Sequence, residues 1–159
     1  MKKDFEPDEI DRWLTEAGWF PGRDIGQQAE EFIQIRIDDA SRQGWQIVAP
    51  DTAIQFTRSY GELELPLPHK SPEAVLMLDP TVGYEGDAED FAQLASDLNR
   101  KIFPIGVETY EFGVWLIDDI GRFFYLHHTG GYFLGMNAYE AFSSILSGNT
   151  LSDAEGYFV

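Results

Sequence analysis

Apolar residues in the first 60 positions recur every three or four residues, which is the period of an amphipathic helix. Pro7 suits the first turn of a helix, and the acidic residues after it are favoured at the positive end of the helix dipole. Glycine follows each apolar stripe, where helices commonly end. The pattern therefore predicts three helices: residues 7–17, residues 27–43, and a short one that is capped by Asp51 or Thr52 and closes near Tyr60 and Gly61.

Beyond Gly61 the period of the pattern changes to two, which is typical of strands. Leu63, Leu65 and Leu67 alternate with Glu or Pro and predict a half-buried strand. The clearest signal lies in residues 112–127, where two β-prone runs flank an Asp- and Gly-bearing turn, as in a hairpin. The other predicted elements are strands over residues 74–78, 101–106 (broken by Pro104) and 132–135, helices over residues 87–100 and from a cap at Asn137 to Gly148, a loop over residues 79–86 and a short tail over residues 151–159.

The predicted order of elements is helices, then mostly antiparallel strands, then a closing helix. This order indicates an α+β fold, with a central mostly antiparallel β-sheet flanked by helices. The length of 159 residues fits a single domain over residues 1–159. The apolar fraction of 43 % is high enough to build a core, which argues against a disordered chain.

Charge narrows the choice of partners. The chain has 11 Lys and Arg against 28 Asp and Glu, for a formal net charge of −17. Binding to nucleic acid is not expected, because it needs basic side chains to displace counterions, and an anionic membrane surface is disfavoured for the same reason. A basic protein partner is the natural complement, and repulsion between copies slightly favours a monomer.

Little in the sequence indicates catalysis. There is no cysteine, and the first seven residues carry two lysines but no apolar run, so we expect a cytoplasmic protein without a secretory signal. His127 and His128 are adjacent on a predicted strand and should point to opposite faces, which argues against a shared metal ion. No cofactor motif is present, and we expect no enzyme activity. A hydrolase built on a carboxylate pair, such as Asp38-Asp39 or Asp118-Asp119, is the alternative.

The most functional-looking segment is acidic. Residues 79–90 hold five carboxylates and no Lys or Arg. One interpretation is a solvated loop followed by an acidic first helical turn. The other is a surface that binds a basic protein, with tyrosines as anchors. Under that second hypothesis, the candidate partner-binding residues are Asp79, Tyr84, Glu85, Asp87, Glu89, Asp90 and Tyr110.

Five short motifs occur in an order that resembles one branch of the SUKH immunity-protein superfamily. They are Ala17-Gly18-Trp19-Phe20-Pro21-Gly22-Arg23, Ser59-Tyr60-Gly61-Glu62-Leu63, Ile102-Phe103-Pro104-Ile105-Gly106, Ile117-Asp118-Asp119-Ile120-Gly121-Arg122-Phe123-Phe124-Tyr125, and the segment from Gly131 to Gly148. The resemblance covers nearly the whole chain. Glu62 and Ile120 depart from the family pattern, at positions where they affect local turns.

The resemblance implies a mostly antiparallel sheet flanked by helices and a cytoplasmic role beside a bacterial toxin. Such a protein binds the toxin and blocks it by sequestration. Members of the superfamily are associated with several classes of toxin, and nucleases are prominent among these. No catalytic residues are implied, and the family's binding residues differ between members, so none can be transferred. The alternative within the same superfamily is a regulatory or scaffold module that binds a host protein and has no toxin partner.

Overall fold

The computed structural model describes residues 4–159, so the two lysines on which the expectation about a secretory signal partly rests lie outside the described residues. The helices are α1 (Pro7–Glu16), α2 (Gln27–Arg42), α3 (Asp51–Tyr60), α4 (Asp87–Leu98) and α5 (Ala138–Ser147), with the short 3-10 helix η1 (Ala154–Tyr157). The strands are β1 (Glu64–Pro66), β2 (Val75–Met77), β3 (Ile102–Glu108), β4 (Gly113–Asp118), β5 (Phe123–His127), β6 (Gly130–Gly135) and β7 (Ser152–Asp153). Among these described residues, no helix is long and apolar enough to cross a membrane.

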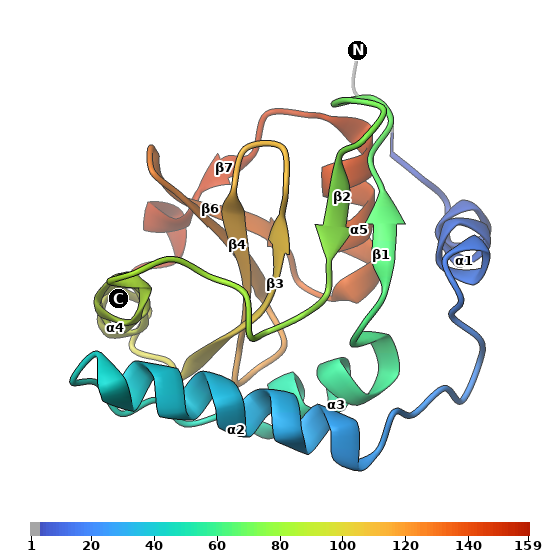
Figure 1. Ribbon diagram of the computed structural model, residues 1–159. Coiled ribbons are helices and arrows are strands. Elements are labelled where there is room, and N and C mark those ends of the chain that lie inside the picture. Colours follow the sequence, from blue (N-terminus) through green and yellow to red (C-terminus); the bar gives the residue numbers. More distant parts are fainter. Residues whose placement is uncertain (1–3) are drawn as a thin grey trace.

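The strands form one sheet in the order β1-β2-β3-β4-β5-β6-β7, and each consecutive pair is antiparallel. This confirms the α+β fold with an antiparallel sheet flanked by helices (Figure 1). The predicted hairpin is also confirmed, with Trp115 paired to Tyr125 across β4 and β5. Its turn is held by Asp118, which accepts hydrogen bonds from the backbone N–H groups of Ile120 and Arg122.

Each face of the sheet has its own apolar core. The larger core packs α1, α2, α3 and α5 against one face, and the smaller packs α4 and η1 against the other. Figure 1 shows α4 and α5 on opposite sides of the strands. Strand β4 contributes Trp115 to the larger core and Leu116 to the smaller, as alternation along a strand requires. Strands β3 and β4 are consequently buried along their whole length.

Three predictions about local structure are wrong. Pro104 does not break its strand, because a register shift between Pro104 and Gly106 absorbs it and β3 continues to Glu108. Helix α3 is preceded by Pro50 as its N-cap residue, so neither Asp51 nor Thr52 caps it. The segment that was expected to be a short tail contains β7 and η1, because Ala154 and Tyr157 pack in the smaller core.

Candidate protein-binding groove

A buried ion pair between α2 and α4 fixes the acidic segment. Arg36 of α2 is 2 % exposed, and its Nη2 lies 2.9 Å from Oδ2 of Asp87, at the start of α4. Oδ2 of Asp87 also accepts the backbone N–H of Tyr84 at 3.1 Å, and its Oδ1 accepts the side-chain amide of Gln43 at 3.0 Å. Gln43 in turn accepts the backbone N–H of Ala88 and so caps the first turn of α4.

This cluster corrects the prediction for Asp87. Its side chain is 1 % exposed, both of its oxygens already have donors, and it does not line the groove described below, so it is not a contact residue for a partner. The local sequence could not show this, because the arginine that neutralises Asp87 belongs to a helix far back in the chain. Asp87 instead positions the loop that carries Tyr84.

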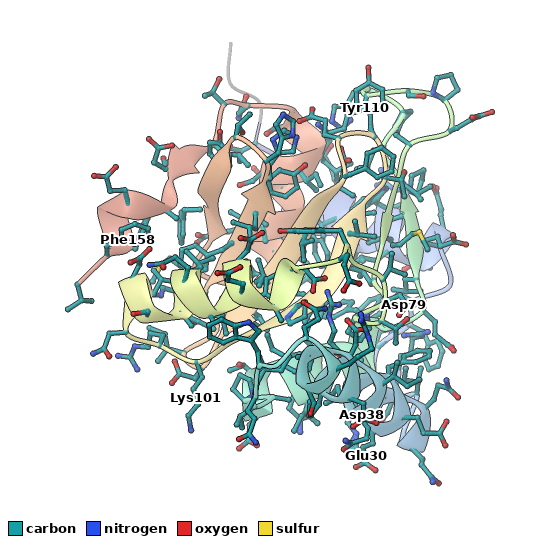
Figure 2. All side chains as sticks on the ribbon, turned by 60° about the vertical axis from the view of Figure 1, so that its left-hand side comes forward. Glu30, Asp38, Asp79, Lys101, Tyr110 and Phe158 are labelled. Carbon is teal, nitrogen blue, oxygen red and sulfur yellow. The ribbon has the colours of Figure 1, made fainter. Side chains whose placement is uncertain are left out.

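The other predicted residues are spread over different surroundings. Asp79 is half-buried and accepts the backbone N–H of Thr81 in a turn. Exposed Glu85 pairs with Arg42 of α2 at 2.9 Å, which lowers the pKa of the Glu85 carboxyl. Glu89 is exposed in the first turn of α4. Tyr110 is exposed in the β3–β4 turn, and Figure 2 shows it well away from Asp79.

Two of the predicted residues come together in a groove beside α4. Tyr84 donates a hydrogen bond to Oδ2 of Asp90 at 2.6 Å, and both side chains line a depression of about 730 Å³. The groove runs between α4 and the turns at the ends of the neighbouring strands. Its other lining residues are Gln93, Leu94, Asp97, Glu111, Phe112, Leu126, His127, His128, Thr129, Gly130, Gly131 and Phe158.

Sequence reasoning missed two exposed phenylalanines of the groove, Phe112 and Phe158. Phe112 is 73 % exposed and has a positive φ of 63°, which is uncommon for a residue with a side chain. Phe158 comes from the C-terminal segment that was predicted to be a tail, and Figure 2 shows it near one end of α4. An aromatic residue in a tight strand turn was the available signal for Phe112. No local pattern identifies Phe158.

The groove is acidic. It contains the carboxylates of Asp90, Asp97 and Glu111, and among its described lining residues there is no Lys or Arg. Burial, and then the hydrogen bond to Asp90, raises the pKa of Tyr84, so this side chain stays neutral at physiological pH. A cationic surface with apolar contacts would complement this groove.

The histidines of the groove do not behave as predicted from strand alternation. The rings of His127 and His128 lie with centroids 4.0 Å apart, because β5 ends at His127 and His128 already belongs to the turn. Even so, no group of three or more His, Cys, Asp or Glu side chains within residues 4–159 is arranged to hold a metal ion.

One arrangement in the groove superficially resembles a hydrolytic triad. Nδ1 of His127 lies 2.9 Å from Oγ1 of Thr129, and its Nε2 lies 3.9 Å from Oε2 of Glu111. The second distance is too long for a hydrogen bond that would orient the imidazole. Thr129 also bonds to the hydroxyl of Tyr132 at 2.7 Å, so its hydroxyl is engaged in the turn.

Comparison with known protein families gives a match over most of the chain. The model of a family described as SUKH-3 immunity protein matches residues 6–148, which is most of the chain and includes every strand of the sheet except β7. Neither the curated proteins nor the solved structures contain a significant match.

Proposed function

The chain belongs to the SUKH-3 immunity protein family, and from this premise we propose that it binds a cognate bacterial toxin and neutralises it by sequestration. Membership of this family supports a role in toxin immunity in general. The proposal adds a site, which is the groove beside α4, and a mechanism that makes or breaks no covalent bond. The observation that carries the site is the combination of exposed aromatic side chains with three carboxylates and no Lys or Arg among the described lining residues.

Charge supports a basic toxin domain as the partner. The net charge of −17 gives the whole molecule a negative field, and the groove adds three carboxylates at one place. Opposite charge steers encounter and can raise association rates far above those of neutral pairs. A toxin that acts on nucleic acid needs basic residues to hold phosphates. A nuclease is therefore a fitting target, since the acidic groove could occupy its phosphate-binding surface.

Aromatic side chains supply the other part of a stable interface. Tyr84, Phe112 and Phe158 are exposed along the groove, and residues of this kind are typical of the few positions that dominate binding energy. A standard interface buries about 800 Å² on each partner. An area of that size would extend beyond the groove to neighbouring surface, including exposed Glu89 and Tyr110.

Protection from a toxin is the direct test. The product of the neighbouring open reading frame is tested as the toxin, by expressing it in a host with and without the chain and measuring growth. We expect growth to be restored and the two proteins to purify as a one-to-one complex whose association slows as salt rises. Absence of both protection and complex would overturn the toxin-binding proposal, and capture of a host protein instead would favour a regulatory or scaffold module.

The location of the site is tested by charge reversal with a matched control. The groove variant combines Asp90→Lys, Asp97→Lys and Glu111→Lys. The control combines Glu16→Lys, Glu31→Lys and Asp38→Lys, which are exposed positions on α1 and α2. Both variants change the net charge by the same amount.

We expect the groove variant to associate at least ~10-fold more slowly than the control. Retained cooperative unfolding in both variants shows that the fold is intact. Equal association rates for the two variants would mean that the total charge matters and that the groove is not the site.

A further inference from the structure

A second pocket adjoins the groove at the end of the sheet. It has a volume of about 350 Å³ and lies among the end of β3, the strands β5 and β6, and the segment that follows α5. Glu111, His127 and Thr129 line both this pocket and the groove. A partner seated in the groove would therefore lie at the mouth of the pocket.

The pocket contains a buried carboxylate that is incompletely paired. The side chain of Glu108 is 0 % exposed. Its Oε2 accepts the backbone N–H of Glu111 at 2.6 Å, whereas its Oε1 is buried and receives no hydrogen bond. The nearest cation to Oε1 is Nζ of Lys70 at 3.4 Å, which Glu111 shares at 3.1 Å. A buried carboxylate oxygen without a donor is costly. A hydrogen-bond donor that reached Oε1 would therefore be stabilising.

The charges of the pocket do not balance. Glu108 and Glu111 contribute two negative charges against one positive charge from Lys70, with His127 beside them. Aromatic walls come from Tyr125 and Tyr132, and the ring of Tyr125 stacks with His127 at a centroid distance of 6.0 Å. A guanidinium group fits this chemistry, because it is always charged, presents several N–H donors in one plane and stacks on aromatic rings.

We propose that this pocket receives an arginine side chain of the protein partner, with the guanidinium donating to Glu111 and, by displacing the ammonium of Lys70, to Oε1 of Glu108. The proposal rests on the function proposed above and deepens it, since it names the chemistry by which the groove's partner is anchored. A buried arginine at the centre of an interface is a common source of binding energy. The pocket then selects a partner by one side chain, while the acidic groove attracts it by charge.

The test uses a small probe, so it does not require the toxin. The full chain, labelled with ¹⁵N, is titrated with N-acetyl-L-arginine amide and observed by NMR. N-acetyl-L-citrulline amide is the control probe, because it has nearly the same shape but no charge. We expect saturable shifts centred on Glu111, His127 and Gly148 with the arginine compound and none with the citrulline compound.

Three variants complete the experiment. Glu108→Gln and Glu111→Gln should each weaken binding of the arginine compound at least ~5-fold, since each removes a charge-assisted acceptor. Glu31→Gln, at an exposed position on α2 that lines neither the pocket nor the groove, should leave binding of the arginine compound unchanged. If Glu108→Gln does not fold, Glu111→Gln decides the outcome.

Equal shifts with both probes, no saturable shift, or unchanged binding in the glutamine variants would overturn the arginine pocket. Such a result leaves the toxin-binding proposal standing, because protection is measured separately. A saturable titration in a protein that gives no protection from the toxin would support the pocket and overturn the proposed function.

Discussion

Asp87 and Glu108 are both buried carboxylates, and their surroundings differ. Asp87 is surrounded by donors: Arg36, the side-chain amide of Gln43 and the backbone N–H of Tyr84. Glu108 has one backbone donor and shares Lys70 with Glu111. Both oxygens of Asp87 have donors, whereas Oε1 of Glu108 has none and Glu108 lines a pocket.

The difference separates a structural carboxylate from one that is available to a ligand. A buried carboxylate whose two oxygens both have donors holds its neighbours in one arrangement, and this is so for Asp87 although Nε of Arg36 has no hydrogen-bond partner. Asp87 does this for the loop that carries Tyr84. An incompletely paired carboxylate in a cavity contributes less to the fold and keeps an acceptor for a partner. The following predictions test whether the two regions differ in this way.

The largest effect is expected from Asp87→Asn. This change removes the nearer of the two carboxylates beside buried Arg36 and leaves Asp39 at 3.6 Å. One end of the new amide must also face either the guanidinium or the amide of Gln43. We expect the free energy of unfolding to fall by ~3–5 kcal/mol, measured by urea titration. Glu89→Gln, in the same helical turn but exposed, is the control and should change it by less than ~0.5 kcal/mol. A small loss for Asp87→Asn would mean that the cluster is not what holds the loop.

Gly83→Ala should have the next largest effect, because it crowds the same cluster. A Cβ at this position would lie 2.1 Å from Oδ2 of Asp87 and 2.5 Å from Nη2 of Arg36. We expect a loss of ~1–3 kcal/mol in the free energy of unfolding. Gly156→Ala is the matched control, since nothing lies within 4 Å of its Cβ. If the two variants unfold at the same urea concentration, the loop tolerates displacement and the cluster is less rigid than its geometry indicates.

Glu108→Gln should cost less than either change near Asp87. The amide oxygen can still accept the N–H of Glu111, and Lys70 keeps its contact with the Glu111 carboxylate. Removal of a buried charge also relieves its desolvation. We expect a change of no more than ~1 kcal/mol in the same urea titration. A loss as large as that of Asp87→Asn would make Glu108 structural and would remove the contrast between the two regions.

The sequence predicted most of the fold because most of its elements are encoded locally. The alternation of Leu63, Leu65 and Leu67 identified a strand, and all three are buried. The hairpin at Asp118 follows from its turn chemistry. The C-terminal tail could not be predicted in this way. Its order depends on long-range packing such as that of Tyr157 on Phe133, whose ring centroids lie 4.1 Å apart.

The candidate site was less predictable, for a related reason. Tyr84 and Asp90 were identified because they lie in one acidic segment, and the structure brings them together in the groove. The ion pair of Asp87 with Arg36 and the contribution of Phe158 depend on segments far apart in sequence. Charge patterns along a chain report composition, and only the fold determines which charges are neutralised. The partner-binding role of the groove remains a prediction.

The smallest effect concerns the pKa of His69, which reports on the charge of Glu108. Burial, and then the charge of Lys70, lowers this pKa below its ordinary value of 6.5, and the Glu108 carboxylate opposes that shift. A lowered pKa stabilises the fold above pH 6.5, and that stabilisation is lost as pH falls through the folded value. In Glu108→Gln the pKa of His69 should therefore fall further, so the loss of folding stability shifts to lower pH. In Asp87→Asn the pKa of His69 should not move. NMR titration of the imidazole signals measures both variants. An unchanged pKa in Glu108→Gln would mean that the buried carboxylate carries no charge, and the contrast with Asp87 would then be one of protonation rather than of pairing.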